Sequence, residues 1–376
     1  MFMKRTDNNL LTKWWLGVDK VVLFAVLGFI VFGALMVCST GPYAAQRARL
    51  DELFYIKKML VYIPVGIVSL FVLSFMKIKW LRYGAWTLFL ILLPSLFVAL
   101  AFPETKGARR WITLPGVFKI QPSEFFKPIF ALVVAMILSR IKELHNREVP
   151  VWQNKRERNY ILLLLGIFGL VILALSLQKD LGMTLTYTVI FFAEVFVAGL
   201  SWKWILVLFG LGITGLACAF KFMPHVVRRL TAFHEGSYQL DMSLKAIGES
   251  GILFGGSGNN IKKLIPDVHT DFIFAGIVEN FGPVIATLIV AVFFSVILHI
   301  LGDVYQKNNK FIVYSVVGIV SYLTFQITIN LSSTLGIIPT KGMTLPFISY
   351  GGSSFVSSCI AIGIILSLLQ DQNLRR

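Results

Sequence analysis

Ten long apolar runs divide this 376-residue sequence and decide what it can fold into. A helix needs about 17–25 mostly apolar residues to cross the hydrocarbon core of a bilayer. Within lipid, a helix also satisfies its own backbone hydrogen bonds, which an irregular chain cannot do. The runs cover residues 21–38, 60–75, 84–102, 125–138, 160–177, 182–200, 204–220, 272–301, 311–330 and 345–369. They predict an all-α, polytopic integral membrane protein with about ten transmembrane helices.

Three of these runs carry a further expectation. The second and fourth are short, so we expect their helices to extend into the flanking residues. The eighth is long enough to tilt or kink. Pro283 within it is the expected hinge, because proline lacks a backbone donor and crowds the preceding turn.

The composition supports a membrane protein and excludes other classes. Hydrophobic residues make up 56% of the chain and charged residues 14%, whereas soluble domains have about 45–50% and about 25%. These values exclude a disordered chain and an ordinary soluble enzyme. Cys38, Cys218 and Cys359 lie at or inside apolar runs without C-x-x-C spacing, which argues against a disulfide-stapled fold and against a zinc site.

The basic charge is explained by topology. The formal net charge is +16, from 35 Lys and Arg against 19 Asp and Glu, and a basic balance is one sign of nucleic-acid binding. With the long segment 221–271 set aside, the excess of Lys and Arg falls on the side of the N-terminus, as the positive-inside rule requires of cytoplasmic loops. We therefore expect a membrane partner and no nucleic acid.

This orientation divides residues 1–376, which we take as one transmembrane domain. Residues 1–20 and 370–376 are then cytoplasmic tails, and residues 221–271 form a large extracytoplasmic loop between the seventh and eighth spans.

Cations on the outer side oppose this bias. Arg109 and Arg110 follow the third span, and Lys262 and Lys263 lie in the long outer loop. Guanidinium groups match phosphate oxygens, and lysine acts as a point charge. The alternative is that these side chains reach lipid phosphates at the ends of spans. As a set, they favour an anionic ligand at the outer face.

Two acidic residues lie where the chain enters the eighth span. Asp267 and Asp271 are four residues apart, so on a helix they would share one face and interact. A partly desolvated carboxylate at the mouth of a span can act as a base. The alternative is that Thr270 or Asp271 caps the helix that follows.

Glu194 and Glu279 lie inside predicted spans, where a charge costs about 2.5–3.5 kcal/mol on insertion scales. We expect Glu279 to face the interior of the bundle, in a structural pair or lining a polar cavity, with a proton relay as the alternative. Gly351 and Gly352 favour close packing of helices.

Five segments, in this order, resemble the SEDS family of bacterial cell-wall polymerases, the shape, elongation, division and sporulation proteins. They are residues 107–112 (GARRWI), 121–127 (QPSEFFK), 238–239 (YQ), 269–275 (HTDFIFA) and 341–354 (KGMTLPFISYGGSS). The resemblance covers nearly all ten runs, and the last two motifs together are highly specific. Residues 266–271 and 339–346 are more similar to the division branch of the family than to its elongation branch.

The chain also departs from the family pattern. Lys179 stands where the family has a proline between Gln178 and Asp180, and Asn280 follows Glu279 where the family has a second glutamate.

The resemblance implies a glycosyltransferase that polymerises lipid II, an undecaprenyl-pyrophosphate disaccharide-peptide, at the outer face of the bacterial cytoplasmic membrane. Such chemistry needs cations around the pyrophosphate leaving group and a base on the acceptor hydroxyl. Asp271 is the expected catalytic base, and direct attack inverts the anomeric centre. The expected phosphate-binding residues are Arg109, Arg110, Lys127, Lys262, Lys263 and Lys341, of which Lys127 and Lys341 are also candidates for ion pairs of the cavity. The expected supporting residues are Glu124, Asp180, Asp267, His269, Thr270, Glu279 and Ser353.

The resemblance also implies partners and a place. The partners are an FtsI-like class B penicillin-binding protein and other division proteins, and the place is the division septum. No organic cofactor is expected. A divalent cation, Mg²⁺ or Mn²⁺, suits the pyrophosphate, although the sequence shows no dedicated cage for one. The open alternatives are a transporter that flips the lipid-linked precursor, an elongation-type polymerase and a non-catalytic division scaffold.

Overall fold

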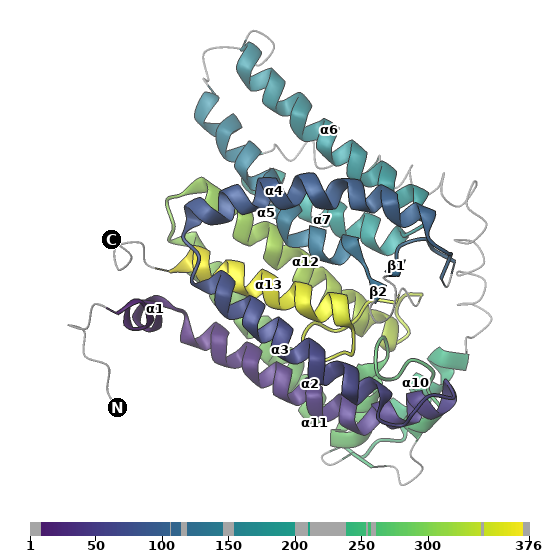
Figure 1. Ribbon diagram of the computed structural model, residues 1–376. Coiled ribbons are helices and arrows are strands. Elements are labelled where there is room, and N and C mark those ends of the chain that lie inside the picture. The colour runs from purple at the N-terminus through teal and green to yellow at the C-terminus, as the bar shows by residue number, and fades with distance from the viewer. Residues whose placement is uncertain are drawn as a thin grey trace.

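The computed structural model describes residues 9–105, 107–113, 119–145, 154–199, 210, 238–252, 255–256, 261–339 and 342–370. They form a bundle of long helices that lie side by side, with a small two-stranded sheet at one end (Figure 1). In chain order the elements are α1 (Leu10–Gly17), α2 (Lys20–Arg47), α3 (Phe54–Ser74), α4 (Ile78–Val98), η1 (Ala99–Ala101), β1 (Ile112–Thr113), β2 (Lys119–Ile120), α5 (Pro122–Leu144), α6 (Lys155–Leu177), α7 (Leu181–Val197), α10 (Tyr238–Gly248), η2 (Ile261–Lys263), α11 (Ile273–Tyr305), α12 (Lys310–Thr334) and α13 (Gly352–Leu369).

The predicted all-α membrane architecture is confirmed. Among the described residues, seven helices are long and apolar enough to cross a membrane: α2, α3, α4 with η1, α6, α11, α12 and α13. Helices α5 and α7 coincide with two further predicted runs. The second and fourth runs extend into their flanks as expected, since α3 begins at Phe54 and α5 at Pro122. Of the run 204–220, residue 210 alone lies within the described residues.

The tenth predicted span begins too early. Residues 345–351 contain turns, and α13 starts only at Gly352. Phe347 has a φ of 65°, which an α-helix does not allow, and the amide of Leu345 donates to the hydroxyl oxygen of Ser349 over 2.8 Å. Leu345 and Phe347 are 2% and 4% exposed, so their apolar character reflects burial inside the protein.

Helix α11 bends at the hinge that Pro283 predicts. Gly282 has φ 84° and ψ 162°, outside the helical region. The glycine-rich segment before η2 packs closely on this bend: a Cβ on Gly282 would lie 2.9 Å from the carbonyl oxygen of Gly251. The amide of Gly256 donates to the carbonyl oxygen of Glu279 over 2.7 Å. The positive φ and the close contact together require glycine at position 282.

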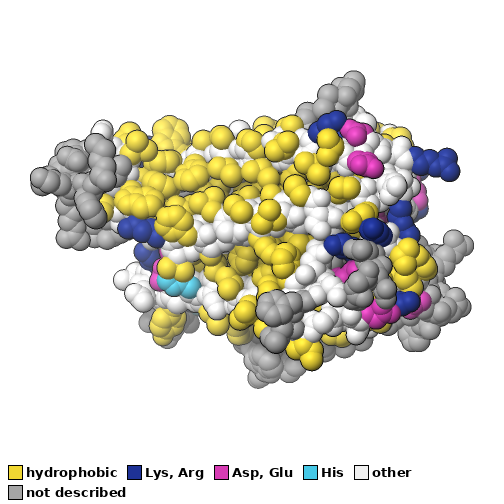
Figure 2. Space-filling model, turned by 90° about the horizontal axis from the view of Figure 1, so that it is seen from below, with side chains coloured by type: hydrophobic (Ala, Val, Ile, Leu, Met, Phe, Trp, Pro, Cys, Tyr) yellow, Lys and Arg dark blue, Asp and Glu magenta, His cyan; other side chains and the backbone are white. Residues whose placement is uncertain are grey.

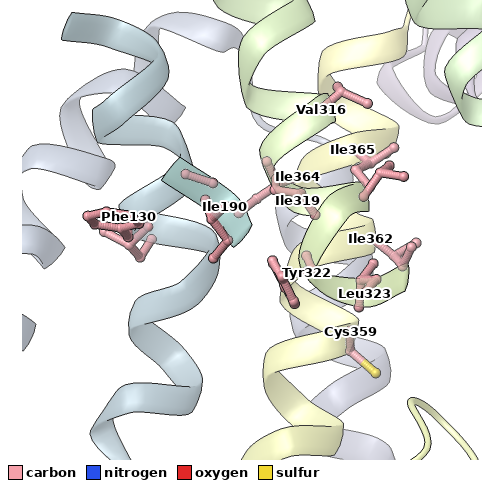
Figure 3. Close-up of a cluster of buried hydrophobic side chains, with 14 of the residues drawn as sticks. Phe130, Ile190, Val316, Ile319, Tyr322, Leu323, Cys359, Ile362, Ile364 and Ile365 are labelled. Carbon is pink, nitrogen blue, oxygen red and sulfur yellow. The ribbon is translucent and has the colours of Figure 1, made fainter. Parts of the chain in front are cut away.

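Helices α12 and α13 are largely buried within the bundle. Helix α13 packs against α3, and α12 packs against α5 and α7. Figure 3 shows buried side chains from this region, including Phe130, Ile190, Tyr322 and Ile365. On the face drawn in Figure 2, hydrophobic side chains cover the middle, and charged side chains gather toward the two ends. This distribution is typical of a protein that lies in a bilayer.

Candidate active site

Asp271 lies at the end of a series of turns, directly before α11. Residues 264–272 are not helical, and Asp267 has a φ of 55°, so Asp267 and Asp271 do not share a helix face. Phe272 occupies the N-cap position of α11 and its side chain makes no capping hydrogen bond. The hydroxyl of Thr270 donates to the carbonyl oxygen of Asp267 over 3.1 Å. The N-cap position of α11 therefore belongs to Phe272 rather than to Asp271 or Thr270.

Asn330 of α12 joins two distant segments at this point. Its side-chain amide donates to the carbonyl oxygen of Asp271 over 2.9 Å and to that of Met343 over 2.6 Å. A Cβ on Gly342, whose φ is 64°, would lie 3.4 Å from Asp271 Oδ2. The carboxylate of Asp271 therefore lies beside the backbone of Gly342.

The motif before α11 is hydrogen-bonded to the motif before α13. The amide of Tyr350 donates to the carbonyl oxygen of His269 over 2.8 Å, and the hydroxyl of Ser349 donates to that of Thr270 over 2.7 Å. The imidazole ring of His269 lies 4.1 Å, between centroids, from the ring of Tyr55 in α3. These contacts fix the backbone that leads into α11 on three sides, from α3, α12 and the segment before α13.

A buried ion pair lies in the first turns of α5. Lys127 Nζ is 2.7 Å from Glu124 Oε2, and the two side chains are 2% and 8% exposed. Lys127 also donates to Gln326 Oε1 over 3.0 Å, while the amide nitrogen of Gln326 donates to the carbonyl oxygen of Thr344 and to the hydroxyl of Ser354. Such additional hydrogen bonds offset the lost hydration of a buried pair. Lys127 is thus engaged by partners within the protein.

The start of α5 is attached to α13 by two serines. Ser353 accepts a hydrogen bond from the amide of Gln121 over 3.1 Å, and the hydroxyl of Ser357 donates to the carbonyl oxygen of Glu124 over 2.6 Å. In a regular helix that carbonyl would receive the amide of residue 128, which is a proline and has no N–H. Ser357 replaces the missing donor.

Arg109 and Arg110 each have a carboxylate partner. Arg110 lies 3.0 Å from Asp180, which is 5% exposed and also accepts the amide of Met183 as the N-cap of α7. The Nε of Arg109 lies 3.9 Å from Glu104 Oε2, and the Arg109 side chain is 55% exposed. Arg109 is therefore the more accessible of the two.

The turn before α7 differs from the one that the family proline would give. Lys179 has a φ of 58°, whereas proline is fixed near −65° and cannot adopt this conformation. Gln178 beside it accepts the amide of Arg109 at its carbonyl oxygen over 3.1 Å and donates from its side chain to the carbonyl oxygen of Leu96 over 2.6 Å. The glutamine thus connects the backbone of Arg109 to the end of α4.

Lys262 and Glu279 meet near the bend of α11. The backbone amide of Lys262 donates to Glu279 Oε2 over 2.5 Å, and Lys262 Nζ donates to Asn280 Oδ1. The amide of Asn280 donates to the hydroxyl of Ser39 in α2 over 3.3 Å. Burial lowers the pKa of Lys262, and the nearby Glu279 carboxylate opposes this shift. Glu279 thus takes part in a structural pairing, while Lys263 is exposed.

The predicted residues lie in separate groups toward one end of the bundle. Helices α5, α7, α11 and α13 all start near the end that carries α10 and the sheet, and the groups lie around these starts and around η2 (Figure 1). Within the described ranges, Arg109 and Arg110 pair with Glu104 and Asp180. Lys341 lies outside those ranges.

Two polar residues that organise the site are absent from the sequence-based predictions. Gln326 and Asn330 of α12 are 3% and 0% exposed and lie four residues apart, on one face of the helix. Their spacing within an apolar run is the signal that could have identified them, because amide side chains inside a membrane protein require hydrogen-bond partners.

A further acidic residue is fully buried away from this end. Glu194 of α7 has no exposed surface and packs against Gly318 of α12, where an added Cβ would overlap the carboxylate. In the part of the chain that the structure describes, neither oxygen of this carboxylate has a hydrogen-bond partner.

The described residues near Asp271 do not form a metal site of their own. Within the described ranges, the one group of three metal-ligating side chains with donor atoms within 4.8 Å of one another is Asp19, His299 and Asp303. Asp19 precedes α2, and His299 and Asp303 belong to the last two turns of α11, so this group lies at the opposite end of α11 from Asp271.

Comparison with known proteins identifies close similarities in sequence. The model of a family described as cell cycle protein, with FtsW, RodA and SpoVE in its name, matches residues 19–374. The probable peptidoglycan glycosyltransferase FtsW of Caulobacter vibrioides is 30% identical over 378 residues, which cover 98% of this chain and 93% of the relative. The corresponding protein of Coxiella burnetii is 33% identical over 369 residues, which cover 94% of this chain and 96% of the relative.

Solved structures agree with these similarities. A chain from a structure that describes how a peptidoglycan synthase complex coordinates polymerization and crosslinking superposes with a TM-score of 0.77 at 26% identity, covering 96% of this chain and 100% of that chain. The rod shape determining protein RodA of Thermus thermophilus superposes with a TM-score of 0.69 at 26% identity. The match covers 94% of this chain and 97% of the RodA chain.

Proposed function

This chain belongs to the cell cycle protein family of FtsW, RodA and SpoVE, and from this premise we propose that it is a peptidoglycan glycosyltransferase that polymerises lipid II for septal wall synthesis. It is a multi-pass membrane protein. The relatives at 30% and 33% identity are both named FtsW, which favours the division role over the elongation role.

The observation that carries this proposal is the position of Asp271. Its carboxylate lies beside Gly342, at the junction of the two most specific motifs of the sequence. The hydrogen bond from Asn330 engages the backbone carbonyl oxygen of Asp271, so this clamp fixes the residue without using its carboxylate. A carboxylate held by its backbone at the mouth of a helix bundle suits a general base.

The reaction follows from this arrangement. The acceptor sugar hydroxyl of the GlcNAc unit attacks the anomeric carbon of the donor, and its proton passes to the Asp271 carboxylate. The bond from the anomeric carbon to the pyrophosphate oxygen breaks, and undecaprenyl pyrophosphate leaves with the electron pair. Direct displacement inverts the anomeric centre. The leaving group needs neighbouring cations because negative charge accumulates on its oxygens.

Arg109 is the cation best suited to that role, because more than half of its side chain is exposed and its carboxylate partner is 3.9 Å away. Arg110 and Lys262 are more closely paired, with Asp180 and with Asn280. A divalent cation, Mg²⁺ or Mn²⁺, remains part of the proposal only as a ligand of the substrate pyrophosphate, since the described residues around Asp271 offer no three-ligand group. No step depends on it.

The orientation and the partner are part of the same proposal. With both termini in the cytoplasm, Asp271 faces the outer side, where lipid-linked precursors are polymerised. The peptidoglycan synthase complex that this chain resembles combines polymerization with crosslinking. By analogy, we expect this chain to bind an FtsI-like class B penicillin-binding protein at the septum, and copurification of the two proteins tests the interaction.

The decisive experiment is polymerisation of labelled lipid II by the purified protein in detergent. Asp271→Asn should lose activity by at least about 100-fold, in line with removal of a general base. Asp51→Asn is the matched control, because it makes the same change at a carboxylate that is 56% exposed and belongs to none of the groups of predicted site residues. Full-length glycan made by folded Asp271→Asn would overturn the assignment. Wild-type activity in detergent, with no membrane to cross, separates a polymerase from a flippase.

A further inference from the structure

A pocket of about 540 Å³ opens between the end of α5 and the beginning of α6, far from Asp271 along the bundle. Helix α6 lies at the edge of the bundle, so the pocket borders the surface that meets lipid (Figure 1). The pocket is lined by Arg140, Leu144, Arg156, Asn159, Tyr160 and Leu163. The proposed transferase reaction makes no use of this site.

The walls of the pocket are fixed by a buried polar cluster. Glu157 of α6 is 2% exposed, and its Oε1 lies 2.8 Å from Nδ1 of His145 at the end of α5. The side chain of Asn154 caps α6 and donates to the carbonyl oxygen of Leu144, a lining residue, over 3.0 Å. The two helix ends are therefore held at a defined separation, as a preformed binding site requires.

The charge of the pocket is positive. Arg140 and Arg156 contribute two guanidinium groups from opposite walls, and each carries five N–H donors. The nearest carboxylate on α6, that of Glu157, is turned away toward His145. Glu143 engages one terminal nitrogen of Arg140 over 2.7 Å and leaves the other donors of that side chain for a ligand. An anion with several oxygens matches this arrangement.

The apolar part of the lining, Leu144 and Leu163, includes a residue on the exposed side of α6. Leu163 is 44% exposed, and Leu162 and Leu170 farther along α6 are 60% and 47% exposed. A free phosphate ion would use only the arginines. A molecule with an anionic head and an acyl chain would use both parts of the pocket, with the chain along the exposed leucines.

We propose that this pocket binds an anionic phospholipid, with the headgroup phosphate between Arg140 and Arg156 and an acyl chain on the Leu163 side of α6. Basic pockets between transmembrane helices are suited to such headgroups. With the N-terminus inside, the pocket lies in the cytoplasmic leaflet. That placement rests on the proposed orientation, whereas the binding itself does not depend on the orientation or on transferase activity.

Native mass spectrometry of the delipidated protein in detergent tests the proposal. Phosphatidylglycerol should bind at least about tenfold more tightly than phosphatidylethanolamine, and the double variant Arg140→Gln/Arg156→Gln should lose about tenfold in affinity for phosphatidylglycerol. The matched control is Lys77→Gln/Lys79→Gln, which removes the same charge from two exposed residues at the start of α4, outside the pocket. Its affinity should stay within about twofold of the wild type.

Three results would overturn the proposal. They are equal affinities for the two lipids, an equal loss in both double variants, and displacement of phosphatidylglycerol by millimolar inorganic phosphate. The last result would show that the arginines take a free anion without its acyl chain. The thermal unfolding midpoint of each variant in detergent, measured without lipid, must match that of the wild type for the comparison to count. If the arginine variant unfolds early, Arg156→Lys provides the second test, because lysine keeps the charge but loses the guanidinium geometry and should give an intermediate affinity.

Discussion

The side-chain amide of Asn330 donates a hydrogen bond of 2.9 Å to the carbonyl oxygen of Asp271, which lies 59 positions earlier in the sequence. The same amide donates to the carbonyl oxygen of Met343, so one side chain of α12 sets the position of the proposed base relative to the segment before α13. In this arrangement Asn330 is a positioning residue, because it acts on the reaction through the backbone of Asp271.

Replacement of Asn330 by leucine should therefore reduce lipid II polymerisation. Leucine has the same branched arrangement of heavy atoms but no donor, and each buried carbonyl left without its partner costs about 1–3 kcal/mol. We expect a loss of about tenfold or more in kcat. The control is Thr328→Val on the same helix, whose exposed hydroxyl bonds only to its own helix. Unchanged kcat in folded Asn330→Leu would contradict the positioning role.

The buried Glu124–Lys127 pair predicts strong coupling in a double-mutant cycle. Lys127→Met leaves a carboxylate buried without its cation and should destabilise the protein by about 3–5 kcal/mol. Adding Glu124→Gln removes that charge and should recover part of the loss. Thermal unfolding in detergent provides the measurement.

The matched control for this cycle is the exposed pair of Lys57 and Asp51, whose side chains are 64% and 56% exposed. Lys57→Met should cost less than about 1 kcal/mol. If the buried and exposed lysines prove equally dispensable, the ion pair in α5 contributes nothing to stability.

The contact between Glu194 and Gly318 predicts a steric effect that a second substitution relieves. A methyl group on Gly318 would overlap the Glu194 carboxylate, so Gly318→Ala should lower the unfolding midpoint and the yield of folded protein. Glu194→Ser in the same chain should restore part of both. Gly166→Ala is the control, because no atom lies within 4 Å of its added Cβ. An unaffected Gly318→Ala protein would be incompatible with this packing.

The lowered pKa of Lys262 predicts a pH trend. Between that lowered value and the ordinary value of 10.5, the unfolded chain binds a proton that the folded chain has lost. The contribution of Lys262 to the free energy of unfolding therefore increases as pH rises through that window. Unfolding midpoints of the wild type should rise relative to those of Lys262→Met as pH increases toward 10.5. Lys262→Arg, which stays charged throughout, should lack this trend. If the difference in unfolding midpoint between the wild type and Lys262→Met does not change with pH, burial does not lower the pKa of Lys262.

Much of the fold follows from the hydropathy of the sequence, because backbone satisfaction in lipid leaves few options. The apolar run before α13 is the exception. Leu345 and Phe347 are buried by protein rather than by lipid, and hydropathy alone does not distinguish the two environments. The bend at Gly282 could be anticipated, since Pro283 has a local steric effect.

The candidate site could be predicted only in part. The sequence singles out Asp271, Arg109 and Arg110 as candidates because charged residues beside apolar runs are rare and stand out. The partners that organise the site, Gln326 and Asn330, are neutral and act over long distances in sequence. The turn of residues 264–272 was also missed: the spacing of its two aspartates fits a helix, but Asp267 has a positive φ.

The bend in α11 has a consequence for the membranes in which this protein can work. With 33 residues, α11 is about 50 Å long, well beyond a hydrocarbon thickness of about 30 Å. Hydrophobic mismatch of this kind is relieved by tilting. Because Gly282 interrupts the helix, the longer part after the bend can change its tilt while the short part before the bend stays fixed to η2 through Glu279. We therefore expect a change in bilayer thickness to alter the tilt of the part after the bend more than the geometry around Asp271.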